Sequence, residues 1–171
     1  MYRRALDISA HVKHKSLFLL GPRQTGKSTL VRHVFPKARY VDLLEADTFR
    51  TLSARPEFLR ESLRTDETLV IIDEVQKLPS ILDEVQLLID RDKKLRFVLT
   101  GSSARKLRRG HANLLGGRAW FLHLHPLISW ETEFGDLERR LNIGIVPSSS
   151  REESVMEFSL LAYGSVRLSS R

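Results

Sequence analysis

The chain has 171 residues, of which 42% are hydrophobic, and this length is sufficient for one domain with a hydrophobic core. It contains no cysteine, which excludes disulfides and thiolate metal sites. No apolar run is long enough to cross a membrane, and the charged N-terminus lacks the apolar core of a signal peptide. These features predict a globular protein of the cytoplasm.

The net charge of +7 is distributed unevenly along the chain. Residues 1–40 hold nine Lys and Arg against one acid, residues 41–90 hold five against twelve, and residues 91–118 hold nine against one. Clustered positive charge is typical of nucleic-acid surfaces. The densest cluster, residues 105–109 (RKLRR), has no interleaved aromatic residues for base stacking. Nucleic-acid binding is therefore one interpretation, and contact with nucleotide phosphates or with solvent is the other.

A phosphate-binding loop is predicted between the first strand and the helix that follows it. Residues 16–20 (SLFLL) are a short apolar run typical of a buried strand, and residues 29–35 predict a helix that ends at Pro36. Between them, residues 21–28 (GPRQTGKS) match the G-x-x-x-x-G-K-[ST] pattern, known as Walker A. The strand and the helix are the context that this pattern requires, which argues against a chance glycine turn.

The residue types in this loop predict their roles. Glycine lets the backbone turn its N–H groups toward a phosphate, and a helix N-terminus adds partial positive charge. Lys27 is expected to reach the β- and γ-phosphates, and the Ser28 hydroxyl is expected to bind Mg²⁺. ATP and Mg²⁺ are thus the predicted ligands. The predicted nucleotide-binding residues are Gly21, Pro22, Arg23, Gln24, Thr25, Gly26, Lys27, Ser28 and Thr29.

Further strands and helices alternate along the rest of the chain. Alternation of this kind predicts an α/β fold with a five-stranded, mainly parallel sheet and helices on both faces. In one predicted helix, Ser80 and Asp83 have the spacing of a capping box, and several apolar residues form one stripe. The predicted strands are residues 39–43, 68–72, 95–100 and 119–124, and the predicted helices are residues 56–63 and 80–91.

An acidic pair follows the strand at residues 68–72. Ligands of parallel sheets bind beyond the carboxyl ends of the strands, where the glycine loop also lies. A buried strand that ends in Asp73 and Glu74 needs a reason, because buried charge is costly unless it is paired or binds a metal. We expect Asp73 to hold Mg²⁺, directly or through water, and Glu74 to orient the attacking water. The alternative is a polar start to the next loop.

Three further parts of the chain supply candidates for the site. Thr100 ends the next strand and Ser102 and Ser103 follow it, and we expect one of these hydroxyls, preferably that of Ser102, to contact the γ-phosphate or the attacking water; helix capping by a serine is the alternative. Arg118 follows two glycines and precedes the last strand, so it is a candidate arginine finger for a neighbouring copy, or a basic surface residue. His123 and His125 share one strand face, but without a third ligand they favour packing or surface roles over metal binding.

These motifs together resemble a prokaryotic family of ATP-binding proteins in the AAA+ superfamily. The resemblance spans roughly residues 2–145 and is carried by GPRQTGKST, YVDLL, VIIDEVQKLP, FVLTGSSARKLRRG, NLLGGRA and LHPL. It implies a P-loop fold of the AAA+ type, with the fourth strand between the first and the third. It also implies binding of ATP and Mg²⁺, with Lys27, Ser28, Asp73 and Glu74 at the family's motif positions.

The sequence departs from that family near its end. Members generally continue into a C-terminal domain, whereas residues 147–171 are serine-rich and predict a poorly structured tail after an ATPase core at residues 1–146. The expected function is an ATPase core coupled to an unknown partner or to a second copy of the chain. The alternative is a nucleotide-binding module, or truncated remnant, without useful turnover.

Overall fold

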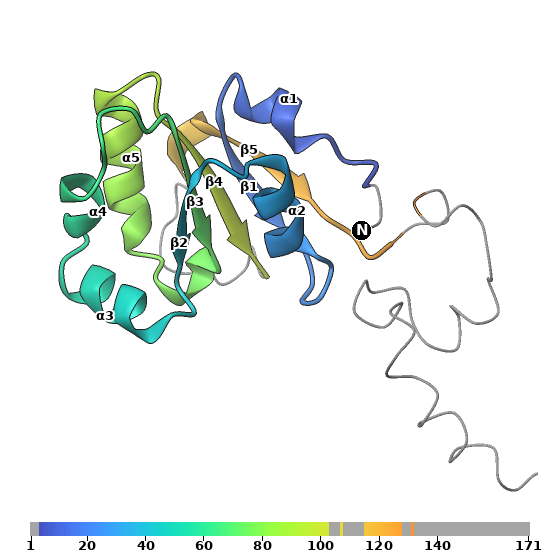
Figure 1. Ribbon diagram of the computed structural model, residues 1–171, viewed down its shortest axis with the longest axis horizontal. Coiled ribbons are helices and arrows are strands. Elements are labelled where there is room, and N and C mark those ends of the chain that lie inside the picture. Colours follow the sequence, from blue (N-terminus) through green and yellow to red (C-terminus); the bar gives the residue numbers. More distant parts are fainter. Residues whose placement is uncertain (1–3, 103–106, 108–114, 128–130, 132–171) are drawn as a thin grey trace, which may run out of the picture. The chain divides into compact units, whose positions relative to one another are not determined.

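A computed structural model describes residues 4–102, 107, 115–127 and 131 of the chain (Figure 1). The chain divides into two compact units, one formed by residues 6–125 and the other by residues 1–5 with residues 126–171. All helices and strands named below belong to the first unit. The predicted boundary between residues 146 and 147 lies outside the described residues and stays a prediction.

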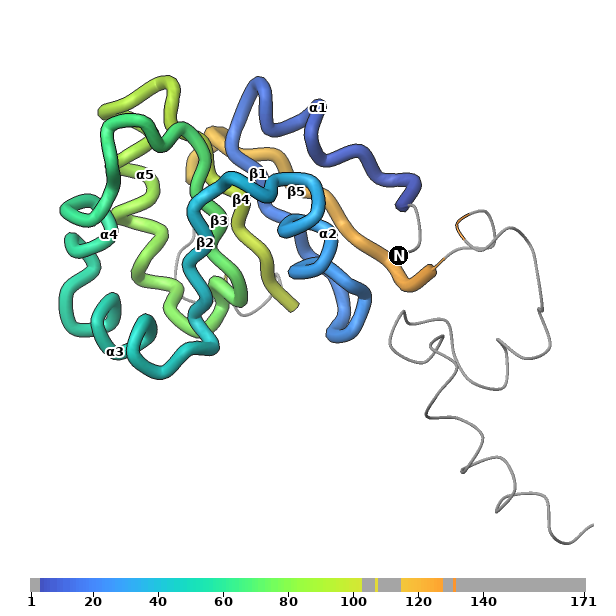
Figure 2. The backbone as a smooth tube through the Cα atoms, in the orientation of Figure 1, coloured from blue at the N-terminus to red at the C-terminus, as the bar shows by residue number. Residues whose placement is uncertain are grey.

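A single five-stranded sheet forms the centre of the first unit, and each strand is parallel to its neighbours. The spatial order is β2-β3-β4-β1-β5 (Figure 2). The fourth strand therefore lies between the first and the third, which confirms the predicted P-loop fold of the AAA+ type. The strands are β1 (Ser16–Leu20), β2 (Arg39–Asp42), β3 (Leu69–Asp73), β4 (Arg96–Gly101) and β5 (Ala119–His123).

The central strands are buried on both faces because their side chains alternate between two hydrophobic clusters. In β1, Phe18 and Leu20 point into one cluster, while Leu17 and Leu19 point into the other. The first cluster includes buried residues of three helices, α3 (Ala46–Ala54), α4 (Phe58–Glu61) and α5 (Ile81–Arg91). The second includes residues of α1 (Ile8–Val12) and α2 (Lys27–Val34). Helices thus cover both faces, as predicted (Figure 1).

Helix α5 has the predicted apolar stripe but not the predicted cap. The stripe residues, Ile81, Leu82, Val85, Leu88 and Ile89, are all buried. Ser80 has right-handed helical backbone angles, and its side chain makes no capping hydrogen bond. Instead, Ile81 N and Leu82 N donate to the carbonyls of Leu78 and Pro79 at 3.2 and 3.1 Å. The prediction of a capping box was wrong, because a preceding turn supplies the acceptors.

Several elements differ from the predicted bounds or were not predicted. Helix α2 begins at Lys27, inside the glycine motif, and α4 is shorter than the predicted 56–63. Helices α1 and α3 and the 3₁₀ turn η1 (Val75–Lys77) were not predicted. The cap of α1 is local, since Asp7 Oδ1 accepts from the backbone N atoms two and three residues later, at 2.9 and 3.3 Å. Among the described residues, no helix has the length and apolar character needed to cross a membrane.

Candidate functional site

The glycine loop joins the carboxyl end of β1 to the start of α2. Gly21 N donates to the Gly101 carbonyl of β4 at 3.2 Å. On the other side, a β-carbon at Gly21 would lie 2.1 Å from the Leu124 carbonyl oxygen, so only glycine fits there. Gly26, which directly precedes α2, has φ +85°, in the left-handed region that favours glycine. Steric constraints therefore explain why both motif positions are glycine.

Lys27 lies inside the loop rather than in solvent. Its side chain folds back so that Nζ donates to the carbonyls of Gly21 and Pro22 at 2.9 and 2.7 Å. The residue is only 5% exposed. Burial lowers the pKa of the Lys27 ammonium, and the charges of Glu74 and Asp73 act in the opposite direction. A buried ammonium with two carbonyl partners is a site where the oxygens of an anion can replace those partners.

The loop also contains an internal hydrogen bond and ends in the first turn of α2. The buried Thr25 hydroxyl donates to the Pro22 carbonyl at 3.0 Å, while Arg23 and Gln24 are exposed. Ser28 lies in the first turn of α2, where N–H groups have no intrahelical acceptor. The first turn contains no acidic residue that would compete with an anion. Exposed Thr29 follows in the same turn.

Asp73 is the last residue of β3 and is 2% exposed. Its two carboxylate oxygens accept hydrogen bonds from two hydroxyls, that of Tyr40 on β2 and that of Thr100 on β4. The same Thr100 Oγ1 accepts from the backbone N of Glu74 at 3.2 Å. Thr100 is fully buried, so its hydroxyl holds the acidic pair in place. The sequence prediction left Thr100 open as a phosphate sensor, but the structure places its hydroxyl on Asp73.

Glu74 turns the chain sharply after β3. Its backbone has φ 59° and ψ 42°, a left-handed conformation that costs a residue with a β-carbon about 1 kcal/mol or more. The turn leads directly into η1. The Glu74 carboxylate accepts a hydrogen bond from the Gln76 side-chain amide, which also contacts Ser102. Ser102 is partly exposed just beyond β4, so its hydroxyl remains a candidate for contact with a ligand.

Tyr40 was not predicted as part of the site. Its hydroxyl bonds to Asp73, and the Arg32 guanidinium lies over its ring, 3.6 Å from the ring centroid. Arg32 in turn lies 3.6 Å from Asp42 at the end of β2. Burial raises the pKa of Tyr40, and the hydrogen bond to Asp73 raises it further. Tyr40 lies on β2, so its position beside the acidic pair can be recognised only once the pairing of β2 with β3 is known.

Arg118 is at the other end of the sheet. It precedes β5, whose first residue pairs with Ser16 at the start of β1, whereas the glycine loop follows the end of β1. Its Nε donates to Asp90 at 2.8 Å, and this bond lowers the pKa of the Asp90 carboxyl. The structure therefore separates Arg118 from the loop of its own chain. A role toward a neighbouring copy stays a prediction.

Two other candidates give no metal site. His123 and His125 are both exposed, and the described part of the chain contains no group of three potential metal-binding His, Cys, Asp or Glu residues.

In the basic stretch 105–109, all residues except Leu107 lie outside the described residues. Leu107 is buried in the first hydrophobic cluster.

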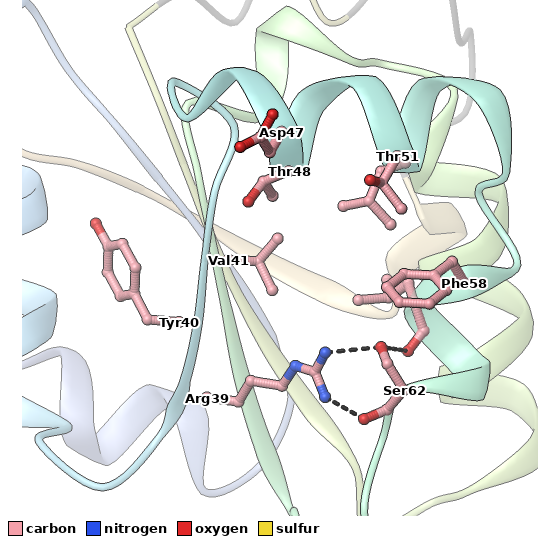
Figure 3. Close-up of a pocket in the computed structure, with 10 residues that line it drawn as sticks. Arg39, Tyr40, Val41, Asp47, Thr48, Thr51, Phe58 and Ser62 are labelled. Atoms are coloured by element: carbon pink, nitrogen blue, oxygen red, sulfur yellow. Dashed lines mark hydrogen bonds between the residues drawn. The ribbon is translucent and has the colours of Figure 1, made fainter.

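A groove of about 300 Å³ lies beside the edge strand β2 and is separate from the glycine loop (Figure 3). Its wall is held by Arg39, whose guanidinium donates to Ser62 Oγ at 2.7 Å. The Tyr40 side chain points away from the groove (Figure 3). The lining residues are Arg39, Tyr40, Val41, Asp47, Thr48, Thr51, Leu52, Phe58, Leu59 and Ser62, and they include no predicted site residue.

Comparison with known proteins supports this reading of the fold. Residues 13–133 match the protein family described as AAA domain, and this stretch covers more than half of the 171 residues. None of the curated proteins matches the chain.

The solved structures that are similar to this chain include two of low sequence identity. The ORC2 protein of Aeropyrum pernix in its ADP form is 18% identical, with a TM-score of 0.44, over 78% of this chain and 48% of that one. Domain III of the Thermotoga maritima replication initiation protein DnaA is 18% identical, with a TM-score of 0.43, over 74% of this chain and 62% of that one. The chain spans less than two thirds of either structure.

Gly21→Ala is expected to destabilise the protein more than Gly117→Ala. The new β-carbon at Gly21 meets a backbone carbonyl, whereas at Gly117 it meets no atom within 4 Å and adds only the strain of φ +77°. Overpacking costs typically about 1–3 kcal/mol and backbone strain about 1 kcal/mol. The free energy of unfolding in urea measures both. A smaller loss at Gly21 would contradict the close approach.

Tyr40→Phe is expected to flatten the fall in stability at high pH. The pKa of Tyr40 in the folded chain is raised above the unfolded value of about 10. The stabilisation from the neutral phenol is therefore complete below about pH 10 and declines as the pH rises above it. Urea midpoints at pH 8 and at pH 11 should differ less for the variant than for the wild type. An equal difference would show that Tyr40 is not coupled to folding.

Proposed function

The chain belongs to the AAA domain family, and we propose that it binds ATP with Mg²⁺ on the loop Gly21–Thr29 and hydrolyses the β–γ anhydride. One observation carries the proposal. A lysine-bearing glycine loop and an acidic pair, of which Asp73 is buried and Glu74 is partly exposed, lie together at the carboxyl edge of the sheet, close enough for both acids to affect the pKa of Lys27. A structural ion pair alone would not need the two glycines.

The residues present suit the phosphates of a nucleotide. The first-turn N–H groups of α2 and the Lys27 ammonium offer converging donors to anionic oxygens. On binding, the ammonium would exchange its two carbonyl partners for phosphate oxygens. The exchange removes an unfavourable feature, since burial alone disfavours the charged lysine.

The residues also suit Mg²⁺, which prefers oxygen ligands and keeps several of its waters. The Ser28 hydroxyl and the Asp73 carboxylate would hold the ion, Asp73 either directly or through a water. When bound, Mg²⁺ neutralises the charge on the β- and γ-phosphate oxygens. Asp73 is already oriented by Tyr40 and Thr100, so the chain supplies a fixed carboxylate rather than a mobile one.

Glu74 is the group proposed to act on water. Its carboxylate would accept a hydrogen bond from a water molecule and orient the oxygen toward the γ-phosphorus. As the new phosphorus–oxygen bond forms, the bond to the β–γ bridging oxygen breaks, ADP leaves with that oxygen, and the proton of the water passes to Glu74 or to phosphate. Ser102, beyond the end of β4, is proposed to contact the γ-phosphate.

A second candidate function is a nucleotide-binding module without useful turnover. It is favoured by the Glu74 carboxylate, which is already engaged by the Gln76 amide. In either case, a bound nucleotide would act on an unknown protein partner or on a second copy of the chain, to which Arg118 would contribute. Nucleic acid is a further candidate partner through the basic stretch 105–109.

Glu74→Gln is expected to reduce Mg²⁺-dependent phosphate release by about 10²–10⁴-fold, because the amide cannot take up a proton. ATP affinity should stay close to the wild-type value, since the phosphates are proposed to bind to Lys27 and to the N–H groups of the loop rather than to Glu74. Glu45→Gln, at an exposed position outside the site, is the matched control and should leave turnover unchanged. Turnover that survives in the Glu74 variant would contradict the mechanism. Binding with background turnover in the wild type would favour the module.

A further inference from the structure

We propose that Gln76 is a positioning residue that links Ser102, beyond β4, to the Glu74 carboxylate, so that a displacement of Ser102 is transmitted to Glu74. The inference rests on the proposed function for its consequence, but the link itself consists of hydrogen bonds between described residues. Gln76 lies between the acidic pair and Ser102, and no role was predicted for it from the sequence.

The Gln76 side chain makes three hydrogen bonds at the carboxyl edge of the sheet. Its Nε2 donates to Glu74 Oε2 and, at 3.2 Å, to Ser102 Oγ. Its Oε1 accepts from Ser102 N, also at 3.2 Å. Both hydrogens of the amide and its oxygen are therefore in use, and Ser102 lies 26 residues from Gln76 in the sequence.

The orientation of the amide follows from its partners. Ser102 N can only donate, so it must face the amide oxygen, and an ionised Glu74 can only accept, so it must face the amide nitrogen. No other side chain of this length offers a donor and an acceptor at one end. Glutamate would place a like charge against Glu74, and methionine would fill the space without hydrogen bonds.

The backbone around the link is shaped to receive it. A β-carbon at Gly101 would lie 2.7 Å from Gln76 Oε1, so glycine there leaves room for the amide. The left-handed backbone of Glu74 starts the 3₁₀ turn that carries Gln76. The missing β-carbon at Gly101 and the left-handed backbone of Glu74 thus both favour this contact.

The consequence concerns the state of Glu74. While Ser102 holds the amide from two sides, the amide holds the Glu74 carboxylate in one orientation. When the Ser102 hydroxyl turns to a γ-phosphate oxygen, the amide loses one acceptor and its hold on Glu74 changes. Loss of the Gln76 amide should therefore impair the orientation of the attacking water by Glu74, and it should leave the binding of ATP to the loop unchanged.

The kinetic test compares Gln76→Met with Gln86→Met, a control on α5 that lies outside the link. Gln76→Met is expected to lower kcat by about 10-fold, as loss of an outer-shell contact commonly does, with the ATP dissociation constant within about twofold of wild type. Ser102→Ala removes both this link and the proposed γ-phosphate contact, so adding it to Gln76→Met should lower kcat by less than the product of the two single effects. Effects that multiply, or an unchanged kcat in Gln76→Met, would overturn the proposal.

An NMR test does not depend on turnover. The side-chain NH₂ signal of Gln76, assigned by its loss in Gln76→Met, should shift in Ser102→Ala and in Glu74→Gln, while the Gln86 signal should not. A Gln76 signal that stays in place in both variants would overturn the link. If the wild type shows no hydrolysis, the proposed function fails but these signals still decide whether Gln76 joins Ser102 to Glu74.

Discussion

The position of β4 between β1 and β3 determines which side chains meet at the carboxyl edge of the sheet. Because the three strands are parallel and paired, the loop after β1, the acidic pair after β3 and the hydroxyls near the end of β4 are brought to one edge. Thr100 is the clearest result, since it lies on the strand between the loop and the acids and bonds to Asp73. With β4 elsewhere, the acidic pair would lose this donor and Glu74 would lose its connection to Ser102.

Each of three charged side chains that the structure describes at this edge, those of Lys27, Asp73 and Glu74, has at least one hydrogen-bond partner. Lys27 uses loop carbonyls, Asp73 uses hydroxyls from two neighbouring strands, and Glu74 uses an amide from η1. Such pairing matters because an unpaired buried charge costs far more than a hydrogen bond provides. These hydrogen-bond partners are neutral groups, while Asp73 and Glu74 also lie close enough to Lys27 to affect its pKa. A nucleotide and its metal ion would then replace weak neutral partners with charged ones.

Much of this arrangement could be predicted from the sequence, because it depends on local patterns. The apolar runs predicted all five strands to within one residue at every end, and the spacing of the glycine motif located the loop. The contacts of Tyr40 with Asp73 and of Gln76 with Ser102 could not be predicted, since they join residues 33 and 26 positions apart and need the strand order first. The capping box predicted at Ser80 and Asp83 was wrong for a different reason. The local pattern was present, but a preceding turn had already satisfied the N–H groups. Helix α3 was missed because only Leu52 is buried along it.

The most direct test of the account is calorimetric titration of ATP with Mg²⁺ into the purified chain and into Lys27→Ala, with exposed Lys37→Ala as the control. The account predicts saturable binding by the wild type and by the control, and a loss of about 10-fold or more in Lys27→Ala, the effect of removing a charge-assisted hydrogen bond. Thermal unfolding of each variant would establish that it is folded. Equal affinity in folded Lys27→Ala, or no binding by the folded wild type, would contradict the assignment of the loop as a nucleotide site.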